Sequence, residues 1–131
     1  MSNHAVKRID EMEAVYLGAF KRARAELGVE AFGMAVIDLP PGFGNYPEHD
    51  HSHDRQEEVF LAMRGSGEIE IDGERFPLDD NHIARVGWRA KRKIWAGPEG
   101  IRLLALSGRP GHLYEPPELS ELGRPDPMAG G

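Results

Sequence analysis

The chain has 131 residues, enough for one domain with a core, and contains no cysteine, which excludes disulfides, zinc–thiolate sites and thiol nucleophiles. Its net charge of −6 argues against general nucleic-acid binding. The first eight residues do not resemble a signal peptide, and no apolar run approaches membrane-spanning length. We therefore expect a soluble, cytoplasmic protein that binds neither nucleic acid nor membrane.

The first element expected is a helix over residues 10–27, within an N-terminal helical segment 1–28. Asp10 and Glu13 form a capping signal at its start, and Gly28 can end it in the left-handed conformation. Apolar residues recur at three- and four-residue steps, at Met12, Val15, Tyr16, Ala19, Phe20, Ala23 and Leu27. This stripe predicts packing on the domain's own core, with contact to a second subunit as the alternative.

Residues 29–115 are typical of an all-β barrel. Short apolar runs alternate with turn signals, and Asp72-Gly73 is a strong signal for a two-residue hairpin. The expected strands are 32–39, 58–64, 68–71, 74–78, 83–86, 92–96 and 101–107. With residues 49–53 they make roughly eight strands, enough to close a small barrel. Residues 116–131 form a proline-rich tail, expected to lie on the surface or to be disordered.

Residues 49–58 contain the most informative pattern, because His49, His51 and His53 alternate and Glu58 follows shortly after. In an extended strand, residues two apart point to the same face, so the three imidazoles can converge. Neutral imidazole is the commonest metal ligand, and a carboxylate completes a mixed nitrogen and oxygen set. The pattern predicts a metal site, and the alternative is a solvated loop whose histidines only titrate.

The spacing His51-x-His53-x4-Glu58-x6-Gly65 resembles the first conserved motif of the cupin superfamily. The resemblance extends over about residues 32–114, with Pro40-Pro41-Gly42 before the histidines and a Gly65-Ser66-Gly67 turn after the strand. It implies a mostly β fold, the cupin jelly-roll barrel, here with one N-terminal helix. It also implies a divalent metal held by His51, His53 and Glu58.

The second cupin motif is degenerate in this chain. The family's glycine, proline, glycine, histidine and asparagine would fall on Asn81, Gly87, Arg89, Arg92 and Ala96. Arg92 therefore stands where metal-binding cupins have another histidine ligand. Arginine stays protonated and offers no acceptor, so it cannot bind a cation. His49 lies on the same face of the expected strand and is the residue expected to compensate.

The alternation of side chains in the strand after the histidines indicates which charged residues face the barrel interior. If Glu58 points into the barrel, alternation turns Arg64 inward and Glu57 outward, so Glu58 is the expected ligand. Without a metal, Glu58 would instead pair with Arg64 or Arg92. Arg92, between Lys91 and Lys93, is expected to face the cavity alone of the three. Arg92 and Arg64 are therefore the candidates for binding an anionic substrate.

Two classes of function fit these features. One is a metal-dependent enzyme of the dioxygenase or isomerase type, using zinc, nickel, manganese or iron on a small anionic metabolite. The other is a non-catalytic barrel that binds a small anion or a metal. The resemblance and the need to cover strand edges also predict a homodimer. Fold analogy alone does not choose a reaction.

Overall fold

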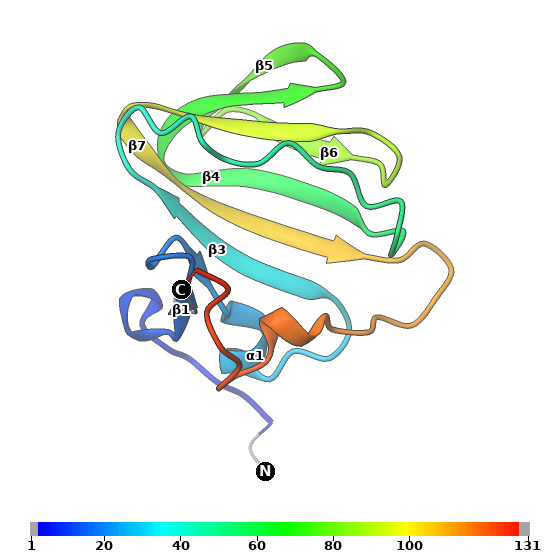
Figure 1. Ribbon diagram of the computed structural model, residues 1–131. Coiled ribbons are helices and arrows are strands. Elements are labelled where there is room, and N and C mark those ends of the chain that lie inside the picture. Colours follow the sequence, from blue (N-terminus) through cyan, green and yellow to red (C-terminus); the bar gives the residue numbers. More distant parts are fainter. Residues whose placement is uncertain (1–2, 129–131) are drawn as a thin grey trace.

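The computed structural model describes residues 3–128 and is built mainly of antiparallel strands (Figure 1). The helices are η1 (Ile9–Glu11), α1 (Ala23–Leu27) and η2 (Glu118–Ser120). The strands are β1 (Ala14–Val15), β2 (Phe20–Lys21), β3 (Gly33–Leu39), β4 (Glu57–Ile71), β5 (Glu74–Leu78), β6 (Ile83–Val86) and β7 (Arg92–Gly108). They follow the order β1-β2-β3-β7-β4-β5, and β6 pairs with β4. None of the described helices has the length and apolarity needed to cross a membrane.

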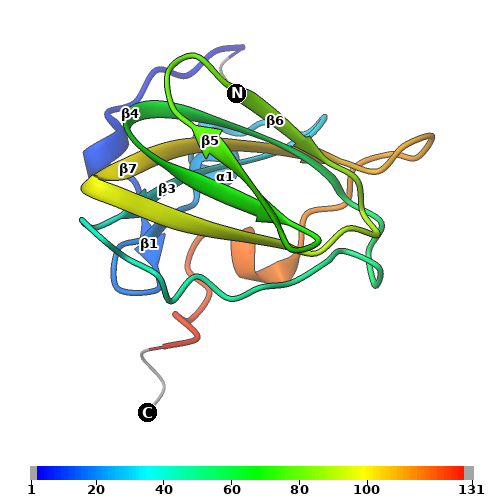
Figure 2. The same ribbon diagram turned by 90° about the horizontal axis from the view of Figure 1, so that it is seen from above.

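The two long strands β4 and β7 pair over most of their length and turn the sheet back on itself (Figure 2). The first part of β4 pairs with β6 and with the end of β7, while its second part pairs with β5 and the beginning of β7. Both strands bend where Gly65 and Gly100 meet, and each of these glycines has a positive φ. A Cβ on Gly65 would overlap the Gly100 carbonyl, so only glycine fits there.

The main core fills the space that the bent sheet encloses. It is made by alternate residues of the strands: Ile37, Leu39, Phe60, Ile69, Leu78, Val86, Ile94, Ile101, Leu103 and Ala105. Because side chains alternate across a strand, Glu58 points to the same side as the fully buried Phe60. The mostly β jelly-roll architecture with a single α-helix confirms the predicted fold class.

The predicted helix over residues 10–27 is wrong in extent. Only residues 23–27 are α-helical, and residues 14–21 form the β1–β2 hairpin. Tyr16, Leu17 and Gly18 make its turn with positive φ angles, which a helix does not allow. Phe20 pairs with Ile37, so the hairpin extends the sheet at β3. The apolar residues of this segment are thus buried by strand pairing. Pairing and burial outweigh the weak helix preference of a short segment.

Other sequence predictions agree with the structure. Asp72 and Gly73 form the β4–β5 hairpin turn, with φ angles of 49° and 86°. Gly28 ends α1 in the left-handed conformation, and its N–H donates to the carbonyls of Arg24 and Ala25. The separately predicted strands 58–64 and 68–71 form the single strand β4, and 92–96 and 101–107 form β7. The bends at Gly65 and Gly100 explain why the sequence predicts two short strands in place of each long one.

The described part of the tail lies against the N-terminal segment (Figure 1). Fully buried Arg22 donates through Nε to the Leu119 carbonyl at 2.8 Å and pairs through Nη1 with Glu13 at 2.7 Å. Glu13 also accepts from the Gly123 N–H at 2.9 Å. These bonds hold residues 119–123 in place, whereas residues 129–131 of the predicted tail, like residues 1 and 2, lie outside the described residues.

Candidate metal centre

The segment 40–56 brings the histidines to the barrel by pairing with the beginning of β7. His49 and Arg92 exchange two backbone hydrogen bonds, of 3.1 and 2.8 Å. The His51 N–H donates to the Trp88 carbonyl at 2.9 Å. Residues directly opposite in such a bridge present their side chains on the same side. His49 and His51 are therefore fixed by backbone bonds next to the barrel interior.

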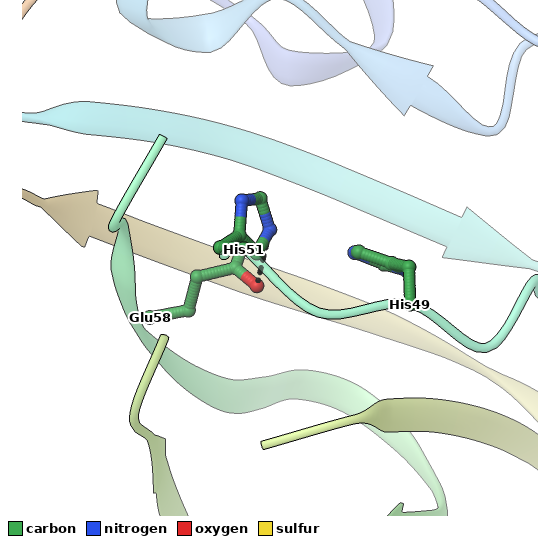
Figure 3. A group of neighbouring side chains, drawn as sticks. All are labelled: His49, His51 and Glu58. Atoms are coloured by element: carbon green, nitrogen blue, oxygen red, sulfur yellow. Dashed lines mark ion pairs between the residues drawn. The ribbon is translucent and has the colours of Figure 1, made fainter. Parts of the chain in front are cut away.

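Three side chains meet at this point: His49, His51 and Glu58 (Figure 3). One potential ligand atom from each lies within 4.8 Å of the others. The rings of His49 and His51 have centroids 5.2 Å apart, and His51 Nε2 is 3.2 Å from Glu58 Oε1. Two imidazoles and one carboxylate form a ligand set suited to a divalent ion of the first transition row.

The other nitrogen of each ring is held by a nearby oxygen. His49 Nδ1 lies 2.9 Å from the Pro47 carbonyl, and His51 Nδ1 lies 2.9 Å from Asp54 Oδ1. An oxygen acceptor at Nδ1 keeps the proton there in a neutral ring, so the lone pair is at Nε2. In metal proteins, a carboxylate in the position of Asp54 orients the histidine ligand and strengthens its basicity.

The contact between His51 and Glu58 leaves two buried acceptors facing each other. Neither His51 Nε2 nor Glu58 Oε1 has a hydrogen-bond partner among the described residues. Burial lowers the pKa of His51, but the Glu58 and Asp54 carboxylates outweigh this effect and hold the pKa above its ordinary value. The site therefore attracts a cation, either a proton on His51 or a metal ion.

Arg92 lies beside Glu58 and is completely buried. Its Nε is 3.6 Å from Glu58 Oε1, and its Nη2 donates to the carbonyls of Val86 and Gly87 at 3.3 and 2.9 Å. The expected pairing of Glu58 with Arg92 is thus present, although the guanidinium is not among the residues lining the cavity. Tyr46 lies near both, and burial followed by the Glu58 charge raises the pKa of its phenol.

A cavity of about 1230 Å³ is enclosed by β2, β3, β7, the 40–56 segment and part of the C-terminal tail, and it reaches these residues. His49, His51 and Glu58 line it together with apolar residues from β2, β3, β7 and the 40–56 segment: Phe20, Ile37, Leu39, Phe43, Ile101 and Ala105. A mostly apolar cavity with a few converging polar groups is typical of small-molecule sites. The candidate ligand atoms are therefore accessible to a small molecule.

Comparison with known proteins finds similarity in structure but not in sequence. No family model matches the chain, and no curated protein matches it. A cupin protein from Bacteroides fragilis superposes with a TM-score of 0.68 at 25% identity, over 89% of this chain and 93% of that one. The chain is a small cupin domain.

Two further structures share the fold of this cupin. A protein from Photorhabdus luminescens has a TM-score of 0.63 at 18% identity, covering 84% of this chain and 90% of that one. A predicted oxalate decarboxylase from Thermotoga maritima has a TM-score of 0.52 at 20% identity, covering 59% and 66%. At these identities the likeness concerns the fold alone.

The predicted site residues of this cupin are only partly brought together. His53 is largely exposed and lies with His51 and Asp54 in a second group, apart from Glu58. The prediction that residues 49–53 form one strand is wrong, because the chain turns after His51, whose carbonyl accepts from the N–H groups of Asp54 and Arg55. This turn rotates His53 away from the barrel interior.

Arg64 lies on β4 beyond the bend of the sheet, six residues after Glu58 and therefore roughly 20 Å along the strand. It is exposed, pairs in register with Arg102, and lines the far end of the cavity. The β4–β7 register shifts between Ala62 and Arg64, so the simple alternation from Glu58 does not extend to Arg64.

Four residues near the site were not singled out by the sequence: Arg24, Asp54, Gln56 and Tyr114 all line the cavity. Asp54 could have been noticed, because a carboxylate three residues after a candidate histidine can reach its ring in a turn. Arg24 and Tyr114 carry no such signal. They come from segments that fold over the barrel end, and only the three-dimensional structure brings them there.

Proposed function

We propose that this cupin binds a divalent metal ion (zinc, nickel, manganese or iron) through His49, His51 and Glu58 and acts there on a small anionic metabolite. The supporting observation is that the buried atoms His51 Nε2 and Glu58 Oε1, which are 3.2 Å apart, both lack a hydrogen-bond partner among the described residues. Two ligands bound to one ion at about 2.1 Å, with an angle of about 90–110°, are about 3.0–3.4 Å apart. The residues therefore fit a metal.

Each residue has a role in this proposal. His49 and His51 offer Nε2, because Pro47 and Asp54 hold their Nδ1 protons. Glu58 supplies the negative charge that favours a cation. When bound, the metal would act as a Lewis acid and as a template for the substrate. The apolar walls of the cavity exclude water around the reacting groups, and a reaction of the dioxygenase or isomerase type is the enzymatic form of the proposal.

The second candidate is a non-catalytic module that binds a small anion or a metal. Arg92 favours it, because a permanent cation 3.6 Å from Glu58 opposes metal binding and takes the place of a further ligand. The accessible cavity favours the enzyme. Both candidates share the metal site, so the first experiment concerns metal binding.

Elemental analysis should find about one metal ion per chain after incubation of the purified protein with zinc, nickel, manganese and iron(II) in turn. His51→Ala should abolish stoichiometric metal, because His51 belongs to both groups of potential ligands. His49→Ala should weaken binding more than His53→Ala, and the exposed His112→Ala is the matched control. Wild-type protein that binds none of the four metals, or His51→Ala protein that keeps its metal, would show that the proposal is wrong.

A further inference from the structure

One end of the cavity carries polar groups beyond the proposed metal ligands. Gln56 lines the cavity and is 5% exposed, and its Oε1 has no hydrogen-bond partner among the described residues. It lies two residues before Glu58, and its N–H donates to Asp54 at 3.3 Å. A buried amide oxygen without a partner is costly unless something else bonds to it. Gln56 therefore indicates a place for a polar ligand group.

Two hydroxyls complete this polar end. Ser107 stands opposite Glu58 on β4 and opposite Gly33 on β3, so it lies beside the metal ligands. A Cβ on Gly33 would overlap Ser107 Oγ and would lie 2.9 Å from the Tyr114 hydroxyl. Both hydroxyls thus gather over the bare backbone of Gly33, and both residues line the cavity. Glycine at this position leaves the two donors room.

Arg24 adds a cation to the same end. Its Nη1 donates to the Val29 carbonyl at 3.0 Å, while its buried Nε has no hydrogen-bond partner, and no carboxylate lies within ion-pair distance in the described part of the chain. The charges of Arg24 and Asp54 both act on the phenol of Tyr114. Burial raises the pKa of Tyr114 most, the Arg24 charge and a hydrogen bond with Ser120 lower it, and the Asp54 charge raises it.

Apart from Arg64 at the far end, the other cations at or near the cavity have acidic partners. Arg102 is bound by Asp38 and Asp10, and Lys21 pairs with Asp38 at 3.0 Å. Arg92 is buried against Glu58 and two carbonyls and is not a lining residue. Of the cations near the metal ligands, Arg24 is the one that lines the cavity without an acidic partner among residues 3–128.

We propose that Arg24, Gln56, Ser107 and Tyr114 form a subsite for the carboxylate of a ligand whose other end binds at His49, His51 and Glu58. The guanidinium supplies charge and a planar donor edge, which suits a carboxylate. The hydroxyls and the amide bind its second oxygen and a neighbouring hydroxyl. The inference rests on the proposed metal site and specifies its substrate class: a short dicarboxylic acid with a hydroxyl beside the metal-binding carboxylate.

Calorimetry of the nickel-loaded protein with lactate, malate and 2-hydroxyglutarate tests this subsite. The three probes share the 2-hydroxycarboxylate that chelates a metal, and only the last two carry a distal carboxylate. At least one of these two should bind tenfold to a hundredfold more tightly than lactate, as expected for a charge-assisted carboxylate contact. Arg24→Gln should remove this preference and leave lactate affinity unchanged, and Tyr114→Phe should reduce it about threefold to tenfold.

Matched variants separate the subsite from general charge effects. Arg89→Gln changes the net charge equally at an exposed residue outside the cavity and should keep the preference. Arg24→Lys keeps the charge but loses the planar donor edge, so it should keep only part of the preference. This variant replaces Arg24→Gln in the test if Arg24→Gln does not fold. Equal affinities for all three probes, a preference that survives Arg24→Gln, or its loss in Arg64→Gln would overturn the inference.

Metal content is measured on every sample, so that failure of the proposed function can be recognised by itself. If the wild-type protein takes up no nickel, the metal site is refuted, and the subsite is tested on the metal-free protein with succinate. Succinate should then bind to wild type and to Arg89→Gln but not to Arg24→Gln. Absence of succinate binding to wild type, or equal binding to Arg24→Gln, would overturn the subsite as well.

Discussion

Replacing Arg92 with histidine should convert a buried cation into a metal ligand. Arginine Nε and histidine Nε2 are each three bonds beyond Cβ, so the imidazole nitrogen can reach the position that Arg92 Nε occupies. That position is 3.6 Å from Glu58 Oε1, close to the separation of two ligands that share an ion. Arg92→Met is the matched control, because it removes the charge without adding a ligand.

The size of the effect follows from the charges. An ion about 2.1 Å from Glu58 Oε1 would lie at most about 5.7 Å from Arg92 Nε. Coulomb repulsion between charges of +2 and +1 at that distance is about 1.5 kcal/mol in water and about 6 kcal/mol at an effective dielectric constant of about 20. Arg92→Met should therefore bind zinc at least about tenfold more tightly than wild type.

The added ligand should contribute further. Structural zinc sites gain about 10–16 kcal/mol from four ligands, or roughly 3 kcal/mol for each. Arg92→His should thus bind zinc about a hundredfold more tightly than Arg92→Met. Without metal, both variants should lose about 3–5 kcal/mol of unfolding free energy, because Glu58 is left without its buried partner.

Competition titrations with a zinc-binding dye measure the affinities, and urea denaturation with and without zinc measures the stabilities. If Arg92→His binds zinc no more tightly than Arg92→Met, residue 92 does not reach the ligand position, and the assignment of the second cupin motif is mistaken. If neither variant differs from wild type, the charge of Arg92 does not oppose metal binding, and the reasoning from its distance to Glu58 fails.

Three further predictions concern assembly and stability. Sedimentation equilibrium at micromolar concentration should show a homodimer, about twice the 14.6 kDa chain mass, and a monomer would contradict this expectation. Gly65→Ala should cost more than about 2 kcal/mol in urea denaturation, because φ is 75° and the Cβ overlaps the Gly100 carbonyl; an unchanged midpoint would contradict the strain argument. Burial raises the pKa of Asp38, but Arg102 and Lys21 outweigh it and hold the pKa below its ordinary value of 3.8. The stability advantage of wild type over Asp38→Asn should therefore be full above that pH and disappear as the pH falls through the folded-state pKa, and a pH-independent difference would refute it.

The strands of the barrel could be predicted because their signals are local. Alternating apolar residues and the Asp72-Gly73 turn determine strand and hairpin within a few residues, and the structure contains both. The helix over residues 10–27 failed for the opposite reason. Its apolar spacing also suits a hairpin, and the choice depends on the open edge of β3, which pairs with residues distant in sequence.

The candidate site was predictable to the extent that it depends on strand geometry. Glu58 points inward because it shares a face of β4 with Phe60. Arg92 pairs with Ile71 at the other end of β4, and it reaches Glu58 beside Val86, the residue opposite Glu58 on β6. The histidine segment is different, since backbone bonds from residues 54 and 55 to His51 replace the expected strand by a turn. A spacing motif counts residues but does not determine such a turn.

The turn after His51 has a chemical consequence. The rings of His51 and His53 still stack, with centroids 5.7 Å apart, but His53 is not grouped with Glu58. The turn brings Asp54 to 2.9 Å from His51 Nδ1, and His49 takes a place near Glu58. One histidine position is thereby exchanged for a carboxylate that orients the remaining ligand. This arrangement increases the basicity of His51 at Nε2, the atom that faces Glu58. Arg92 opposes metal binding at the same carboxylate, because its positive charge lies 3.6 Å from Glu58. The turn at residues 51–55 and the buried Arg92 therefore have opposite effects on metal binding.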